Sequence, residues 1–321
     1  MMETRLRFIA SYPESGGHWA GALLAAYLDG GGNEEVPQLP SDADAAPYHQ
    51  ASPLPPRNLG FGAQVQTRSA ALLGLARSTD SSPVATTHNA AVVHEGLSLF
   101  STVFTGKVAV VVRDPRDVAV SLSQRLEVPA EEAVEFMADR ERVLAHDNHL
   151  AHAVSSWSTH VATWLQYDAV PTRFFRYEDL LAETEEELTK MLGFLDVEEA
   201  VERDRVREAV ELASPEAVRR QHRSLAAEGA VPEHRRVCRR GSVGIWRDIL
   251  DERLLRGIEK EHGELMRAAG YQPLLAAGGD SAQAAAGSKS QPDLDAEGLV
   301  TRAAETGLGS QATTDRAAAA G

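Results

Sequence analysis

The sequence lacks most of the features that mark secreted, membrane-spanning or nucleic-acid-binding proteins. It has a single cysteine, Cys238, among 321 residues. No disulfide can therefore form within the chain, as is typical of proteins kept in a reducing cytoplasm. No apolar run is long enough to span a bilayer, and the first residues do not resemble a signal peptide. We therefore expect a cytoplasmic protein that does not insert into a membrane.

Positive charge is also scarce. The chain has 32 Lys and Arg against 47 Asp and Glu, a formal net charge of -15. This excess of negative charge argues against partners such as nucleic acid or an anionic membrane surface. Arginines nevertheless gather between residues 219 and 240. We interpret Arg219, Arg220 and Arg223 as solvent-facing, and Arg239 and Arg240, beside a glycine turn, as candidate anion ligands.

Strand and helix patterns alternate along the chain, and 43% of the residues are hydrophobic. This indicates an α/β fold of three layers, with a central parallel sheet flanked by helices. The pattern predicts strands at 5–11, 84–87, 107–112 and 172–176. It predicts helices at 19–28, 64–76, 115–124, 130–144, 151–167, 180–195, 201–212, 217–225 and 251–269. We expect one domain over 1–275 and a disordered, low-complexity tail over 276–321.

The most informative stretch runs from Val110 to Leu122. An apolar run typical of a buried parallel strand ends at Arg113, and Asp114-Pro115 then begins a helix. Arg113 and Ser121 can therefore face one pocket at the carboxyl end of the strand. A guanidinium, a hydroxyl and the amides of a helix start together favour a phosphate ligand.

Four ordered motifs between about residues 5 and 271 carry a resemblance to a family. The stretch just described resembles the 3'-phosphate-binding segment of sulfotransferases that use 3'-phosphoadenosine-5'-phosphosulfate (PAPS). Residues 11–19, SYPESGGHW, resemble the family's phosphosulfate-binding loop. Residues 176–180, RYEDL, and 239–247, RRGSVGIWR, resemble two further family segments. The resemblance implies a P-loop-like fold, PAPS as co-substrate with PAP as its product, no metal, and a small-molecule acceptor.

The resemblance also implies roles for individual residues. Trp19 would stack on the adenine, Tyr177 would contact it, and His88 would take the proton of the acceptor hydroxyl or amine. The phosphosulfate loop would supply Ser15, Gly16 and Gly17. The 3'-phosphate would be held by Arg113, Ser121, Arg239, Arg240 and Gly241.

Other interpretations of these residues remain open from sequence alone. Trp19 and Tyr177 could be core aromatics, and His88 could be an ordinary surface or core histidine. Four further histidines lie close together, at positions 146, 149, 152 and 160. No carboxylate or cysteine pattern completes a metal site there, so we expect these four side chains on the surface.

The sequence departs from the family where the 5'-phosphosulfate would bind. Glu14 and Thr86 stand where the family carries lysines, Gly17 and His18 replace hydroxyl residues, and Pro215 replaces an aromatic that sandwiches the adenine. A carboxylate at position 14 would point toward an anion, and repulsion in a partly desolvated site costs on the order of several kcal/mol. Losing a cation that stabilises the leaving group costs roughly 10²–10³ in rate.

Three hypotheses follow, in order of preference. The first is a sulfotransferase in which protonated His18 or an arginine replaces the lysines. It would act on a small molecule, which the Ala- and Arg-rich, bacterial-looking composition suggests is a bacterial secondary metabolite. The second is an enzyme of the same fold with altered chemistry, such as an intramolecular displacement that expels sulfate or phosphate, with Glu14 as a base. The third is a non-catalytic nucleotide-binding protein. A nucleoside triphosphatase is disfavoured because the loop lacks the Gly-Lys-Ser/Thr ending. The oligomeric state cannot be inferred from the sequence.

Overall fold

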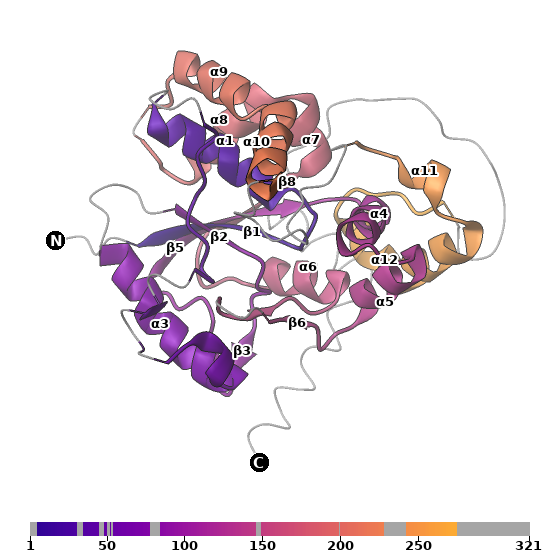
Figure 1. Cartoon of the computed structure of the whole chain (residues 1–321), viewed down its shortest axis with the longest axis horizontal. Coiled ribbons are helices and arrows are strands. Elements are labelled where there is room, and N and C mark those ends of the chain that lie inside the picture. The colour runs from indigo at the N-terminus through magenta and orange to yellow at the C-terminus, as the bar shows by residue number, and fades with distance from the viewer. Residues whose placement is uncertain are drawn as a thin grey trace.

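The computed structural model describes residues 5–30, 35–44, 48–49, 52, 54–77, 84–145, 149–198, 200–227 and 242–274. Its centre is a four-stranded parallel sheet in the order β2-β1-β5-β8 (Figure 1). The strands span Leu6–Ser11 (β1), Val84–Thr87 (β2), Thr105–Val112 (β5) and Thr172–Arg176 (β8). The central parallel sheet with flanking helices confirms the predicted fold class.

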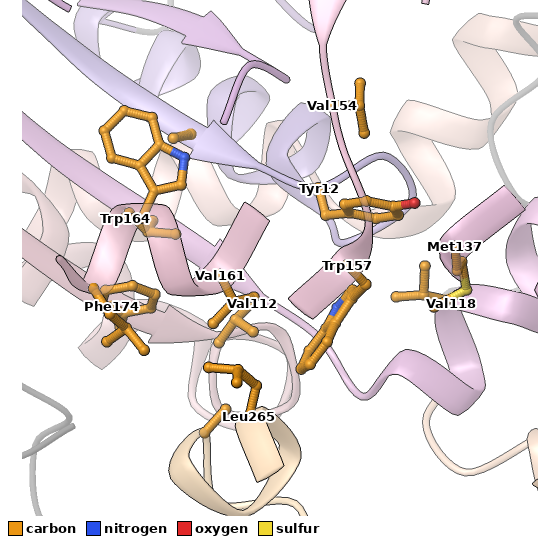
Figure 2. Close-up of a cluster of buried hydrophobic side chains, with 14 of the residues drawn as sticks. Tyr12, Val112, Val118, Met137, Val154, Trp157, Val161, Trp164, Phe174 and Leu265 are labelled. Carbon is orange, nitrogen blue, oxygen red and sulfur yellow. The ribbon is translucent and has the colours of Figure 1, made fainter. Parts of the chain in front are cut away.

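Helices cover both faces of the sheet, which explains why its middle strands are apolar on both sides. Along β5, the consecutive residues 108–112 are all buried. One face packs against α1 (Gly17–Asp29), α8 (Thr184–Phe194), α9 (Arg203–Leu212) and α10 (Pro215–Ala227). The other packs against α3 (Phe61–Arg77), α4 (Pro115–Leu126), α5 (Ala130–Ala138), α6 (Trp157–Leu165) and α12 (Glu252–Ala268). Figure 2 shows part of this second cluster, which includes Trp157 and Trp164.

The strand order reverses beside β1. The chain passes from β1 to β2 on one side and then returns to β5 on the other. In open α/β sheets, ligands bind outside the carboxyl ends of the strands at such a point. The loop after β1 and Arg113 after β5 both lie at this edge of the sheet, so the topology itself places the two predicted phosphate-binding segments side by side.

The remaining helices and strands of the described residues are short. They are η1 (Pro56–Asn58), β3 (Val93–His94), β4 (Leu97–Ser98), β6 (Val143–Leu144), β7 (His152–Ala153), α7 (Tyr177–Ala182) and α11 (Trp246–Ile249). No helix in the described ranges is both long enough and apolar enough to cross a bilayer. The predicted tail, 276–321, lies outside the described residues.

Two predicted helices are wrong at their junction. The helix expected over 130–144 ends at Ala138, where the Asp139 carboxylate accepts the backbone N–H of Glu141. The helix expected over 151–167 begins only at Trp157, capped by the Ser156 hydroxyl. The residues between form β6 and β7, which pair antiparallel. This pairing competes with helix formation but cannot be seen in either segment alone.

The helix expected over 180–195 is also interrupted. It forms two helices, α7 and α8, that meet at Glu183, whose φ of -132° and ψ of 55° lie outside the helical region. The sequence pattern over 180–195 did not predict this break, because a single non-helical residue leaves the apolar periodicity almost unchanged.

Candidate active site

The loop between β1 and α1 is shaped by two glycines. Gly16 has a φ of 96°, which favours glycine, and a Cβ at this position would lie 2.3 Å from Cδ2 of Tyr177. A Cβ on Gly17 would lie 2.1 Å from the Ser11 hydroxyl oxygen. Both glycines therefore allow close packing between the loop and its surroundings. They also bring the first amides of α1 to the edge of a pocket, where such groups can bind anions.

Arg113 ties this loop to two other segments. Its guanidinium donates to the Glu14 carbonyl at 3.0 Å and to the Ser242 carbonyl at 3.1 Å. It also stacks over the Tyr177 ring, with its central carbon 4.7 Å from the ring centroid. Arg113 is only 3% exposed, so this one side chain holds together the strand end, the loop and the start of α7.

Glu14 is turned toward α4. Its carboxylate accepts the Ser121 hydroxyl at 2.6 Å through Oε2 and pairs with Arg125 at 2.8 Å through Oε1. The backbone of Glu14 has a φ of 64°, a conformation that non-glycine residues rarely adopt. The predicted phosphate ligand Ser121 thus meets a carboxylate of its own chain.

A pocket opens over this edge of the sheet. It is lined by Glu14 and residues 16–19, by His88, Arg113 and Tyr177, and by Pro215, Val218 and Arg219 of α10. Ten of the predicted site residues are described, and eight of them line this pocket. Ser15 and Ser121 are not among the lining side chains, and the Ser15 hydroxyl is buried with no hydrogen-bond partner. Arg239, Arg240 and Gly241 lie outside the described residues.

The two predicted adenine-binding aromatics lie against each other. The rings of Trp19 and Tyr177 meet edge to face, with centroids 5.8 Å apart. Trp19 is 8% exposed, and its indole N–H donates to the Ala213 carbonyl at 2.9 Å. Both rings contribute to the core of that face and also line the pocket, so the two interpretations of these aromatics are compatible.

His88 follows β2 and directs one ring nitrogen toward the pocket. Its Nδ1 lies 2.9 Å from the Ser11 carbonyl oxygen. Because a carbonyl can only accept, this contact places the proton on Nδ1 and leaves Nε2 as the basic nitrogen. Nε2 lies 3.5 Å from Nε2 of His18. Burial, together with the neighbouring His18 and His152, lowers the pKa of His88 well below its usual value, so the ring is neutral and able to accept a proton.

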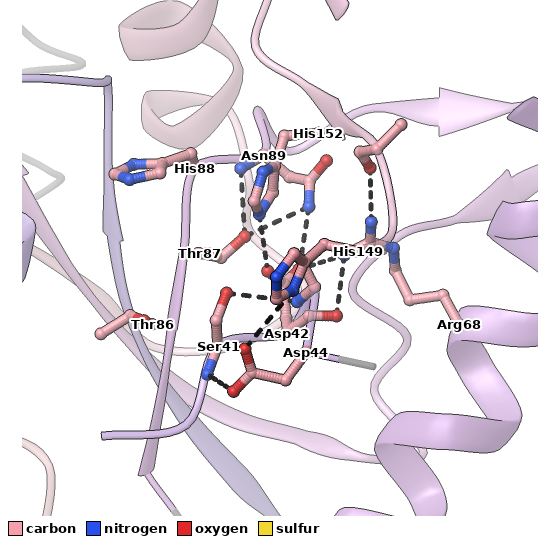
Figure 3. A network of polar contacts seen from close by, with 12 residues as sticks. Ser41, Asp42, Asp44, Arg68, Thr86, Thr87, His88, Asn89, His149 and His152 are labelled. Carbon is pink, nitrogen blue, oxygen red and sulfur yellow. Dashed lines mark hydrogen bonds and ion pairs between the residues drawn. The ribbon is translucent and has the colours of Figure 1, made fainter. Parts of the chain in front are cut away.

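A buried polar network lies behind His88 (Figure 3). Asp42 forms an ion pair with Arg68, accepts from the Asn89 amide at 2.8 Å and lies 3.2 Å from Nε2 of His152. Burial alone would raise the pKa of Asp42, but Arg68 and His152 hold it at about 2. The ring of His152 in turn contacts that of His88, with centroids 5.6 Å apart. The network thus supports the segment that carries His88.

The prediction of a surface histidine patch is wrong for two of its members. His152 is 5% exposed and pairs with Asp42, and His160 is 1% exposed and packs edge to face against Tyr12. Burial lowers the pKa of His160 to about 3. His149 retains 29% side-chain exposure, and His146 lies outside the described residues. Within the described ranges, no three His, Cys, Asp or Glu side chains converge as a metal site.

Several site residues were missed by sequence reasoning. Arg125 could have been found, since it lies one helical turn after Ser121 and so shares its face of α4. Arg219 was expected in solvent but lines the pocket. Asp117 accepts the backbone N–H groups of Gly244 and Trp246 at 2.6 and 3.2 Å. It thereby holds the segment after residue 241 against α4. The sequence around Asp117 does not predict this contact.

Comparisons with known proteins show which family and which fold the chain resembles. A family model described as "Sulfotransferase domain" matches residues 7–270. Cytosolic sulfotransferase 12 of Arabidopsis thaliana is 27% identical over 180 residues, and the match covers 52% of each chain. The chain therefore aligns with about half the length of this curated relative.

Two solved structures show a similar fold. A mouse sulfotransferase, SULT7A1, complexed with PAP is 19% identical with a TM-score of 0.50, covering 82% of this chain and 85% of that one. A retinol dehydratase in complex with retinol and PAP is 17% identical with a TM-score of 0.53, and the match covers 83% of this chain and 82% of that one. With the family model spanning nearly the whole described fold, the chain belongs to the sulfotransferase family.

Proposed function

We propose that the protein transfers a sulfuryl group from PAPS to a hydroxyl or amine of a small molecule. One observation carries the proposal. The basic nitrogen of His88 faces the same pocket as the loop amides, Arg113 and the paired aromatics Trp19 and Tyr177. A base and the elements of a nucleotide site are thus combined. The PAP bound in the two similar structures supports the choice of nucleotide.

The residues divide the reaction between them. Trp19 and Tyr177 offer aromatic surface to the adenine, while Arg113 and the start of α1 offer cationic and amide groups to phosphate. The acceptor oxygen or nitrogen forms a bond to sulfur as the bond from sulfur to the bridging oxygen breaks. The nucleotide phosphate leaves with that electron pair, and Nε2 of His88 takes the acceptor's proton. His18, beside it, can supply positive charge when protonated, in place of the missing lysines.

The acceptor is proposed as a small molecule, and a bacterial secondary metabolite is the class that composition suggests. The named ligand of the similar retinol dehydratase structure, retinol, is a small molecule. The proposed setting is the cytoplasm.

The test offers the protein PAPS and adenosine 5'-phosphosulfate with a panel of small alcohols, phenols and amines, and follows the sulfated product by mass spectrometry. His88→Asn keeps a donor for the Ser11 carbonyl but removes the basic nitrogen. It should lower the rate about 10²–10⁴-fold. His94→Asn is the matched control, because His94 packs on Phe61 and does not line the pocket. Equal rates for wild type and His88→Asn would refute the role of His88.

Nucleotide binding is tested separately by calorimetry. We expect micromolar binding of an adenosine nucleotide, lost in Arg113→Ala because the loop, the strand end and Tyr177 all depend on that guanidinium. A folded protein that binds neither PAP nor AMP would refute the proposed function as a whole.

A second candidate function is favoured by Glu14. The fold supports other chemistry, since one similar structure is a retinol dehydratase, and a carboxylate in place of a lysine suits a base better than a leaving-group cation. Glu14→Lys separates the candidates. It should preserve or raise turnover if sulfuryl transfer operates, and abolish activity if Glu14 is a working base. An unchanged rate on the true substrate would remove Glu14 from both mechanisms.

A further inference from the structure

His152 is a buried histidine whose ring packs against the proposed base (Figure 3). We propose that His152 is a positioning residue for His88: anchored by Asp42, its ring keeps the His88 ring in place with Nε2 toward the pocket. The inference rests on the proposed function, in which Nε2 of His88 takes the proton of the acceptor. It gives a part in the reaction to a side chain that is not among those lining the pocket.

The ring of His152 is held by the residues around it. Its Nε2 lies 3.2 Å from Oδ1 of Asp42, and because a carboxylate can only accept, this nitrogen carries a proton. Asp42 is itself held in place by its ion pair with Arg68 and by the Asn89 amide, which donates to it at 2.8 Å. His152 is also 5% exposed, so its ring has little room to turn.

The ring of His88 is restrained from two directions. Its Nδ1 donates to the Ser11 carbonyl at 2.9 Å, but one hydrogen bond alone would leave the ring able to tilt. The His152 ring meets it edge to face, with centroids 5.6 Å apart and planes inclined at 72°, a favourable arrangement for two aromatic rings. The two contacts together keep Nε2 of His88 facing the pocket, where it lies 3.5 Å from Nε2 of His18.

Hydrogen bonds join the chain segments that carry the two histidines. The side-chain oxygen of Asn89 accepts the N–H of Ala153 at 2.7 Å, and the Ala153 carbonyl accepts the N–H of Ala90 at 2.8 Å. The residues that follow His88 are thus bonded to the residue that follows His152. This arrangement matters for catalysis because a general base must lie within hydrogen-bond reach of the proton it takes, and small misplacements are costly in rate.

His152 acts on His88 through charge as well as through packing. Burial is the main cause that lowers the pKa of His88, and His18 of α1, His152 of β7 and Arg125 of α4 lower it further, whereas the bond to Ser11 raises it. Removing the positive charge that His152 carries when protonated should therefore raise the pKa of His88. A general loss of stability would not produce this shift.

The first test follows the His88 imidazole by NMR between pH 4 and 8, on the full chain without substrate. The His88 signal is identified by its loss in His88→Asn. Wild type should carry the proton on Nδ1 and titrate well below 6.5. His152→Gln keeps an amide donor for Asp42 but removes the ring and its charge, so it should raise the His88 midpoint by at least about half a pH unit. His262→Gln is the matched control, because His262 is 1% exposed and packs on Trp157 instead.

The second test measures turnover with PAPS at pH 8, where His88 is neutral in every variant and a loss of rate reports its orientation. His152→Gln should lower kcat by about tenfold or more. It should leave the affinity for PAP within about twofold, because His152 does not line the pocket. His262→Gln should leave both quantities close to those of wild type.

Each outcome has a distinct meaning. An unchanged His88 midpoint in His152→Gln, or an unchanged kcat at pH 8, overturns the inference. Equal changes in His152→Gln and His262→Gln would indicate a general loss of packing and would also overturn it. If no acceptor is sulfated but the His88 signal still depends on His152, the result counts against the proposed function and not against the contact between the two rings.

A second variant keeps the test decisive if His152→Gln does not fold, as judged by its thermal unfolding. His152→Phe retains a ring against His88 but has no charge and no bond to Asp42. It should shift the His88 midpoint upward as well, and an unchanged midpoint would overturn the inference.

Discussion

Replacing Arg68 with methionine should destabilise the protein strongly, because it leaves the buried carboxylate of Asp42 without its cation. Arg68 lies on α3 and is 2% exposed, and the Asp42 side chain is fully buried. The guanidinium also donates to the Asp42 carbonyl at 3.2 Å and to the Ala151 carbonyl at 2.6 Å. It therefore joins the segment before residue 45 to the segment that leads into β7.

The expected loss follows from these contacts. Breaking a buried ion pair by removing one partner costs about 3–5 kcal/mol, and each carbonyl left without a donor adds about 1 kcal/mol. We expect the free energy of unfolding to fall by about 5–7 kcal/mol, against a total of about 5–15 kcal/mol for a typical domain. The loss should be greatest near neutral pH. It should shrink in acid, because the variant's Asp42 carboxyl can then take up a proton and shed its charge.

Urea denaturation followed by tryptophan fluorescence measures this loss. The double variant Asp42→Asn/Arg68→Met removes the charge together with its partner, so it should be more stable than Arg68→Met alone. Arg220→Met is the control, since Arg220 is exposed on α10 and should change stability by less than about 0.5 kcal/mol. If Arg68→Met costs less than about 1 kcal/mol, or if the double variant is no more stable than it, the reasoning about the buried charge is refuted.

Two further predictions concern the loop and the buried histidines. Gly16→Ala should destabilise the protein by about 1–3 kcal/mol more than Gly30→Ala in urea denaturation. Both positions have a positive φ, but only Gly16 abuts the Tyr177 ring. Equal losses of unfolding free energy in the two variants would exclude the clash with Tyr177. The free energy of unfolding should fall as the pH drops below about 6.5. Burial lowers the pKa of His88, and it lowers the pKa of His160 to about 3 and that of His262 to about 4. The unfolded chain therefore binds protons that the folded chain does not. The measurement is thermal unfolding between pH 4 and 8, and a His262→Asn variant with an unchanged slope would contradict this cause.

The sequence predicted the centre of the fold well because the determining signals there are local. The apolar run of β5, the break at Asp114-Pro115 and the start of α4 at Pro115 all lie within a few residues of one another. The Asp114 side chain accepts the N–H of Arg116 as an N-terminal cap, which is what such a sequence favours. Local propensity and the tertiary structure agree at this point, so the strand and the helix could both be predicted with nearly correct ends.

The polar network behind His88 could not be predicted, because its contacts join residues far apart in the chain. Asp42 meets Arg68 after 26 residues, Asn89 after 47 and His152 after 110. Each of these residues is unremarkable in its own segment. The same limitation explains the misplaced histidines: composition around His152 and His160 resembles a surface helix, whereas the pairing of β6 with β7 and the packing of α6 bury both side chains.

Glu14 shows how a substitution that appears unfavourable in sequence can be compatible with a stable site. Considered as a lysine replaced by a carboxylate, it implies several kcal/mol of repulsion toward an incoming anion. In the structure the same carboxylate is balanced by Arg125 and by the hydroxyl of Ser121, so these three side chains are paired without an external anion. Any phosphate must therefore compete with a carboxylate that is covalently part of the site and permanently present.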